Sequence, residues 1–236
     1  MTSTKKTMIA SLVALASLVA VPAQADTLAS WTSQTFTTNN SNQLVQNFAA
    51  QSSDLYIQLS LTPKAGAISE NDFTVLWLDN TTTGDHTGVA NIGLKADIVG
   101  AAGDYMVRGN STQNFMGAYT TDQAAIGKTV NLYAHLYKSA GSLTYDRFDL
   151  WSNPVTSSWN ALLATAPEAT STLNTDLSSI STVGFRTATL ASGDQVTVNS
   201  AAVFNAIPAV PEPESYAMFL AGLGLMAGIA RRRTRR

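Results

Sequence analysis

Residues 54–63 read DLYIQLSLTP and alternate between apolar and polar side chains. In an extended chain this alternation sends one set of side chains to each face, because the side-chain period of a strand is two. One face carries Leu55, Ile57, Leu59 and Leu61, and the other carries Tyr56, Gln58 and Ser60. The stretch therefore predicts a half-buried β-strand, followed by a turn at residues 63–66.

Similar stretches lie further along the chain, and Gly, Asn, Asp and Pro separate most of them. They predict strands at 73–79, 91–97, 104–109, 129–138, 143–152, 181–188 and 194–204. A loop at 80–88 closes the first of these. Within 157–178 one or two helical turns are expected from Trp159 to Leu163. Residues 26–47 are rich in Thr, Ser, Asn and Gln, a composition that leaves open an irregular segment or an edge strand.

Many short strands and little helix favour an all-β fold, and we expect an antiparallel β-sandwich in one domain over residues 26–204. A body of about 185 residues is long enough to bury a sizeable core. The chain has no cysteine, so disulfides and thiolate metal sites are excluded. The core alone must therefore stabilise the domain.

Two regions resemble strands of laminin G, lectin and glucanase sandwiches. One is RFDLWSNP at 147–154, and the other is the pair formed by VGFR at 183–186 and QVTVNSAAVF at 195–204. The resemblance implies a jelly roll of the concanavalin A-like kind. It concerns the fold and not the function, because one fold carries many functions.

The body of the protein is acidic. Residues 26–210 hold seven of the 14 Lys and Arg residues and fourteen of the 16 Asp and Glu residues, which gives a net charge of −7. An acidic surface repels phosphate backbones and anionic headgroups. The charge argues against nucleic acid or an anionic lipid surface as a partner of this domain.

The N-terminus has the organisation of a secretory signal peptide over residues 1–25. Lys5 and Lys6 precede an apolar run from Met8 to Val21, and Ala23-Gln24-Ala25 is a small-x-small cleavage site. We expect cleavage between Ala25 and Asp26, and the run is short for a permanent anchor. The protein is therefore predicted to be exported.

The C-terminus combines three features in order: a linker at 205–214 that contains Pro-Glu-Pro, an apolar segment at 215–230, and a basic tail at 231–236 with five arginines. Its apolar run, Tyr216 to Ala230, has fifteen residues, which at about 1.5 Å rise span roughly 22 Å, a little less than a bilayer core. The segment is thus expected to be a single transmembrane helix, either transient or permanent, with its arginines in the cytoplasm.

This arrangement resembles the PEP-CTERM sorting signal, carried by Val210, Pro211, Glu212 and Pro213 and the helix and arginines after them. The resemblance implies recognition by an exosortase, an integral-membrane protease, and removal of the tail during export. It implies delivery to the cell surface or the extracellular space, but it covers only residues 210–236 and describes no activity of the body.

One face of three predicted strands is a candidate glycan-binding surface if the strands share a sheet. Aromatic rings stack on the CH faces of sugars, and charged groups bind the hydroxyls. The alternative is a structural face in which Arg147 pairs with a nearby acid. The predicted face contains Trp77, Asp79, Tyr133, His135, Tyr137, Tyr145, Arg147, Asp149 and Trp151.

Metal and catalytic sites have weaker signals. Asp79 and Asp85 flank a turn-rich loop and are weak calcium candidates, because loop carboxylates bind Ca²⁺ but are also ordinary turn residues. No other cofactor is indicated. The body has two glutamates, Glu70 and Glu168, both in predicted turns or linkers, and it lacks the glucanase ExDxxE signature and a GxSxG elbow. No catalytic residue is predicted.

These observations predict an exported, non-enzymatic structural or adhesive component of the cell surface or extracellular matrix, associated with exopolysaccharide. The first alternative is a carbohydrate-binding module, and the second is a polysaccharide hydrolase. The role follows from the sorting-signal resemblance and the solvated surface of the body.

Overall fold

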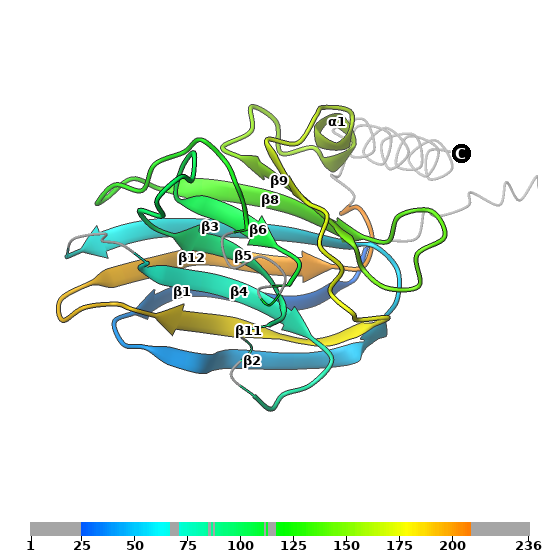
Figure 1. Cartoon of the computed structure of the whole chain (residues 1–236), viewed down its shortest axis with the longest axis horizontal. Coiled ribbons are helices and arrows are strands. Elements are labelled where there is room, and N and C mark those ends of the chain that lie inside the picture. Colours follow the sequence, from blue (N-terminus) through cyan, green and yellow to red (C-terminus); the bar gives the residue numbers. More distant parts are fainter. Residues whose placement is uncertain are drawn as a thin grey trace, which may run out of the picture.

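The computed structural model describes residues 25–66, 71–84, 86, 88–110, 112 and 117–208. In this part of the chain the strands form two sheets of six, which pack face to face. Figure 1 shows the two layers one behind the other, with β2, β11, β4, β5 and β6 in the nearer layer. Every strand pair is antiparallel. The predicted all-β antiparallel sandwich is confirmed.

The strands of the first sheet run in the order β1-β12-β3-β8-β9-β10. Their bounds are β1 (Thr27–Phe36), β12 (Gln195–Phe204), β3 (Leu55–Ala65), β8 (Val130–Tyr137), β9 (Arg147–Ser152) and β10 (Ala169–Ser171). A short helix, α1 (Trp159–Leu163), packs through Trp159 and Leu162 against the outer side of this sheet, where Tyr56 and Trp151 lie.

The strands of the second sheet run in the order β2-β11-β4-β5-β6-β7. Their bounds are β2 (Asn40–Gln51), β11 (Ile180–Ala188), β4 (Phe73–Asp79), β5 (Ala90–Lys95), β6 (Tyr105–Arg108) and β7 (Ala118–Tyr119). The core fills the space between the sheets, and its side chains are those that alternate inward. In β8 these are Val130, Leu132, Ala134 and Leu136, all fully buried.

The predicted strands at 73–79, 129–138, 181–188 and 194–204 and the helix at 159–163 agree with the structure to within about a residue. The strands β7 and β10 were not predicted. Both are short, and β10 falls inside the segment 157–178, in which helical turns were expected only from Trp159 to Leu163. Three or fewer residues are too few to display a period of two.

Residues 26–47 contribute two strands, β1 and β2, and each forms an edge of its sheet. The edge-strand alternative is therefore correct, and the irregular alternative is wrong. Few apolar side chains are needed, because only Ala29, Trp31 and Phe36 of β1 are buried. Trp31 reaches across the sandwich to Phe185 of β11, with 5.1 Å between ring centroids.

The predicted turn at 63–66 is wrong in position, because β3 continues to Ala65. Pro63 pairs with Val196 beside a shift in register, and its carbonyl oxygen accepts the amide of Gly127. A proline is tolerated here because β8 pairs with β3 only as far as Leu61. The strand predicted at 143–152 is too long at its start, because β9 begins at Arg147 and does not include residues 143–146.

The two ends of the described body lie together. The amide of Asp26 donates to Oδ1 of Asn205 at 2.9 Å, and the amide of Asn205 donates to the carbonyl oxygen of Asp26 at 3.3 Å. The predicted domain bounds, 26 and 204, are adjacent to this contact. The predicted signal peptide up to residue 24, the linker from Ala209 onward, the transmembrane helix and the basic tail lie outside the described residues. No helix in the described part is long and apolar enough to span a membrane.

Candidate functional site

The predicted glycan-binding face is divided between two sheets. Strand β4 pairs with β5 and β11, whereas β8 pairs with β3 and β9. Trp77 and Asp79 therefore belong to the second sheet, and Tyr133, His135 and Asp149 belong to the first. The assumption that the three strands share a sheet is wrong, because alternation within a strand carries no information about its neighbours.

Trp77 is fully buried and cannot bind a ligand at the surface. The ring of His86 stacks on it with centroids 3.6 Å apart and planes 5° from parallel. On β11, Gly184 leaves room for the indole, since a Cβ atom there would lie 2.5 Å from Cζ2 of Trp77. Trp77 is thus a structural residue and not part of an exposed aromatic face.

Asp79 is also committed to local contacts. Its Oδ2 lies 2.9 Å from Nδ1 of His86, and its Oδ1 accepts the amide of Asn80 at 2.7 Å. Asp85, the other calcium candidate, lies outside the described residues. Within the described ranges no three His, Asp or Glu side chains gather in a way that could hold a metal ion. The calcium hypothesis has no support from Asp79.

Five of the predicted residues do lie together on the outer face of the first sheet. Tyr137 pairs with Arg147 and His135 pairs with Asp149 in the register of β8 and β9. All five side chains are partly exposed. We call this set the aromatic strip: Tyr133, His135, Tyr137, Arg147 and Asp149.

Stacking orders the strip. The imidazole of His135 lies between two phenol rings, at 4.8 Å from Tyr56 and 4.4 Å from Tyr137, and both pairs are close to parallel. Nε2 of His135 lies 2.9 Å from Oδ2 of Asp54. Burial and the nearby Asp149 raise the pKa of Tyr137, so its hydroxyl keeps its proton at neutral pH.

Trp151 and Tyr145 do not contribute to the strip. Trp151 is buried with α1, and its Nε1 donates to the carbonyl oxygen of Ala166 at 3.1 Å. Tyr145 precedes β9 and points into the core, where its hydroxyl lies 2.7 Å from the carbonyl oxygen of Ser53. The predicted alternative for Arg147, pairing with an acid, holds in part, because its Nη1 lies 3.4 Å from Asp146.

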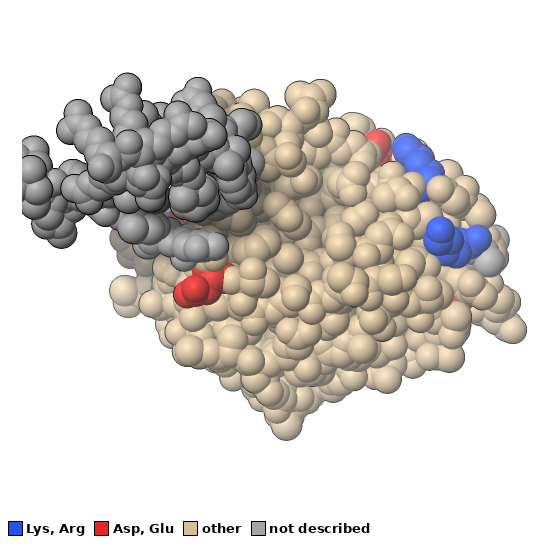
Figure 2. Space-filling model, turned by 180° about the vertical axis from the view of Figure 1, so that it is seen from behind, with Lys and Arg blue, Asp and Glu red and all other residues tan. Residues whose placement is uncertain are grey.

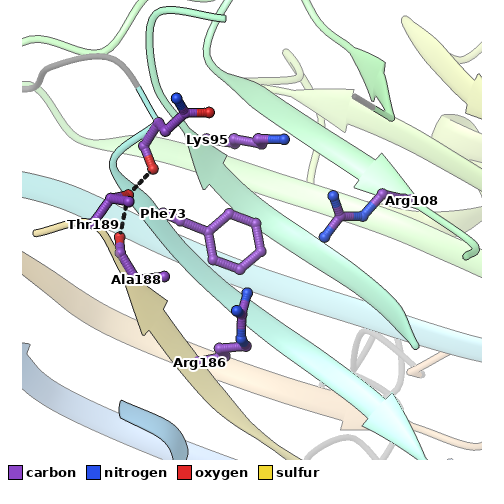
Figure 3. A pocket seen from close by; sticks show the side chains of 7 residues that line it. Phe73, Lys95, Arg108, Arg186, Ala188 and Thr189 are labelled. Atoms are coloured by element: carbon purple, nitrogen blue, oxygen red, sulfur yellow. Dashed lines mark hydrogen bonds between the residues drawn. The ribbon is translucent and has the colours of Figure 1, made fainter. Parts of the chain in front are cut away.

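A second site was missed by the sequence reasoning. The outer face of the second sheet is hollowed into a pocket of about 390 Å³. We call it the basic pocket, because Lys95, Arg108 and Arg186 surround the ring of Phe73 in it, as Figure 3 shows. The hydroxyl of Thr189 contacts the carbonyl oxygens of Asn71 and Ala188 at its rim.

Two of these cations are almost completely buried. Lys95 and Arg108 are each 2% exposed, while Arg186 is partly exposed. Burial, and then the charges of Arg108 and Arg186, lower the pKa of Lys95 to about 8. Burial is also the main cause that lowers the pKa of Arg108 to about 10. The guanidinium carbon of Arg186 lies 5.0 Å from the centre of the Phe73 ring, and that of Arg108 lies 5.5 Å from it.

A signal for this pocket was present in the sequence. Lys95, Arg108 and Arg186 are each the one charged residue in their strand. Charged residues are almost never fully buried unless they are paired. The sequence could not show that these three residues lie together, because the pairing of β11 with β4 joins segments about a hundred residues apart.

A comparison with protein families identifies residues 209–236 as the PEP-CTERM protein-sorting motif. This confirms the resemblance noted for the C-terminus, and it indicates export and sorting to the cell surface. The match includes Val210, Pro211, Glu212 and Pro213, which lie outside the described residues. No curated protein sequence matched the chain at a significant level.

Solved structures similar to the chain include concanavalin A-like lectin sandwiches. Peanut lectin is 9% identical, with 79% of this chain and 91% of that chain covered and a TM-score of 0.47. The exoplasmic domain of VIP36 is 10% identical, with coverage of 78% and 89% and a TM-score of 0.42. A fructofuranosidase from Schwanniomyces occidentalis is 12% identical, with coverage of 78% and 35% and a TM-score of 0.42. Likenesses at this level do not bear on what this chain binds.

Proposed function

We propose that the chain is an exported, non-enzymatic protein of the cell surface or extracellular matrix that adheres to exopolysaccharide through the aromatic strip. The observation that carries the proposal is the pairing of β8 with β9, which gathers Tyr133, His135 and Tyr137 beside Arg147 and Asp149 on one outer face. Partly exposed aromatic rings can stack on the CH face of a sugar, and the charged groups beside them can hydrogen-bond its hydroxyls.

Two further observations support adhesion: one face of the body shows few charged groups, and the strip is ordered. Figure 2 views the molecule from behind, and the described atoms on that side are mostly neither acidic nor basic. The strip also lies in an ordered stack, since His135 is held by Asp54 and by two flanking rings. A pre-ordered surface loses little conformational entropy on binding.

The non-enzymatic part of the proposal is supported by how the carboxylates are used. Glu168 accepts the hydroxyl of Ser152 at 2.6 Å, and Asp149 accepts that of Thr170 at 2.7 Å. Asp104 accepts the amides of Asp97 and Ala124. Glycoside hydrolysis needs two carboxyl groups that flank one bond, and these three carboxylates are occupied in separate structural contacts.

The sorting motif supports the route to this location. An exosortase would recognise Pro-Glu-Pro at 211–213 and remove the apolar segment and basic tail. The segment at 215–230 then serves as a transient membrane anchor during export. The body would then be released to the surface, where it can meet an exopolysaccharide.

The test is affinity electrophoresis of the processed protein in gels that contain the producer's own polysaccharide. The double variant Tyr133→Ala/Tyr137→Ala should weaken the retardation about fivefold or more, because two stacking rings are removed. Tyr119→Ala is the matched control, since it removes the same ring from the second sheet. Equal retardation of the double variant and the unmodified protein would contradict the proposal.

A separate assay addresses the enzymatic alternative. The unmodified protein is incubated with the same polysaccharide, and reducing ends are counted over time. Release of reducing sugar would overturn the non-enzymatic role even if the protein also binds. A constant number of reducing ends, together with retardation in the gel, is the expected result.

A further inference from the structure

The outer face of the first sheet carries a small polar hollow next to the aromatic strip. Gln58, Ser60, Asn131, Tyr133 and Ser200 line it, and Tyr133 belongs to the strip as well. We propose that this hollow, which we call the amide hollow, binds the acetamido group of an N-acetylated sugar. This site rests on the adhesive function proposed above, and it defines the class of sugar that the face selects.

Strand pairing builds the amide hollow from β12, β3 and β8. Ser60 of β3 lies opposite Ser200 of β12 and opposite Asn131 of β8. Gln58 lies opposite Tyr133, two residues further along the same two strands and therefore on the same face. The register of the three strands thus brings two side-chain amides, two hydroxyls and one phenol ring together.

The two amide side chains are available to a ligand. Within the described part of the chain, neither the Gln58 nor the Asn131 side chain takes part in a hydrogen bond with another protein group. The backbone of Asn131 is held in place, because its amide donates to Oδ1 of Asn153 at 3.0 Å and its carbonyl oxygen accepts the amide of Asn153 at 2.7 Å. An amide on a fixed strand loses only side-chain entropy when a ligand binds.

The lining of the hollow matches an acetamido group. A glutamine or asparagine side chain offers N–H donors and a carbonyl acceptor, and an acetamido group offers an acceptor and a donor in return. The ring of Tyr133 gives the methyl group an apolar contact. The described lining residues include no charged group, and burial raises the pKa of Tyr133, so its hydroxyl stays neutral. A charged substituent would lose hydration there without gaining a counter-charge.

The size of the hollow selects a substituent and not a whole sugar ring. Its volume is about 60 Å³, which holds roughly four to six water-sized spheres at about 10–15 Å³ each. Sites that enclose a whole small molecule are larger, at roughly 300–1,000 Å³. The sugar ring therefore stays on the open face, beside the partly exposed Tyr133, and its acetamido group enters the hollow. A hydroxyl group alone would leave most of this volume to water.

Titration calorimetry of the processed protein tests the proposal with chitotetraose as the probe. Cellotetraose is the comparison ligand, because it has the same linkage between rings but a hydroxyl in place of each acetamido group. We expect chitotetraose to bind about tenfold or more tightly than cellotetraose, as for a gain of two hydrogen bonds. Equal affinity for the two probes, or no binding of either, would overturn the proposal.

Two variants localise the site. Gln58→Leu and Asn131→Ala should each weaken chitotetraose binding about fivefold or more, and should change cellotetraose binding less than about twofold. Gln58 is partly exposed and Asn131 is exposed, so the fold should tolerate both changes. Gln195→Leu is the matched control, since Gln195 is a partly exposed glutamine of β12 that does not line the hollow. A loss as large in the control, or an equal loss for both probes, would contradict binding of the acetamido group in the hollow.

Failure of the amide hollow and failure of the adhesive function give different results. If the producer's polysaccharide retards the protein while both tetrasaccharides bind equally, the adhesive function stands and the acetamido ligand is wrong. If Gln58→Leu weakens chitotetraose binding but the producer's polysaccharide does not retard the unmodified protein, the amide hollow stands and adhesion to that polysaccharide is wrong.

Discussion

The imidazole ring of His86 stacks on the indole ring of Trp77, with the ring centroids 3.6 Å apart and the planes parallel to within 5°. Asp79 holds the imidazole in this position through Nδ1. Consequently a histidine in a turn-rich loop closes the outer side of β4, and a tryptophan that the sequence suggested for sugar binding is fully buried.

His86→Ala should lower the free energy of unfolding by about 2–4 kcal/mol, because it removes an aromatic pair and leaves a buried carboxylate oxygen without its partner. Urea-induced unfolding followed by circular dichroism measures the change. Thr82→Ala is the control, since Thr82 is an exposed residue of the same loop. A loss of stability no greater than that of the control would contradict the structural role of His86.

Gly184→Ala should destabilise the protein by about 1–3 kcal/mol, because the new Cβ atom would lie 2.5 Å from Cζ2 of Trp77 in a packed layer. Gly88→Ala provides the comparison, since its Cβ atom would meet only Cγ2 of Thr112, at 3.6 Å. Thermal melting of both variants should separate them. Similar melting temperatures would mean that the indole has room to move.

Lys95→Met should change how stability depends on pH. The pKa of Lys95 is about 8 in the folded protein and 10.5 at its ordinary value, so between these values the unfolded chain binds more protons. The contribution of Lys95 to the free energy of unfolding should therefore rise by about 1–3 kcal/mol from pH 8 to 10.5 and stay constant below pH 8. Arg108 and Arg186 face the amine, and the pKa of Arg108, about 10 in the folded protein, lies inside this pH window.

Unfolding in urea at several pH values measures this effect as the difference between Lys95→Met and the unmodified protein. The control is the difference in the free energy of unfolding between Lys128→Met and the unmodified protein at the same pH values. Other groups that titrate at high pH, such as Tyr119, whose pKa is raised by burial, contribute to both differences. We expect the free energy of unfolding of Lys95→Met, minus that of the unmodified protein, to fall as the pH rises. A difference that does not vary between pH 8 and 10.5 would rule out the depressed pKa.

Processing of the C-terminus is tested by mass spectrometry of the mature protein from producing cells. If an exosortase acts at the sorting motif, the mature C-terminus should lie close to residues 211–215. Replacement of Glu212 by Ala should leave the precursor intact and keep it in the membrane fraction. Mature surface protein that still ends at Arg236 would instead indicate a permanent anchor.

The sequence by itself was sufficient for the strands with clear alternation and for the sorting signal. The alternation in 54–61 and in β8 predicts which side chains enter the core, because the period of two is a property of a few neighbouring residues. The sorting motif is likewise contained in one continuous stretch, 209–236. Both are local features, and local features are readable from one chain.

Only the tertiary structure decided which strands are neighbours. Trp77 lies in a different sheet from Tyr133 and His135, and Lys95, Arg108 and Arg186 lie together around Phe73. Pairings such as that of β11 with β4 connect distant segments, and several arrangements of the same strands would bury the same apolar faces. The physical reason is that alternation specifies which face is buried, whereas the sheet to which a strand belongs depends on packing across the whole molecule.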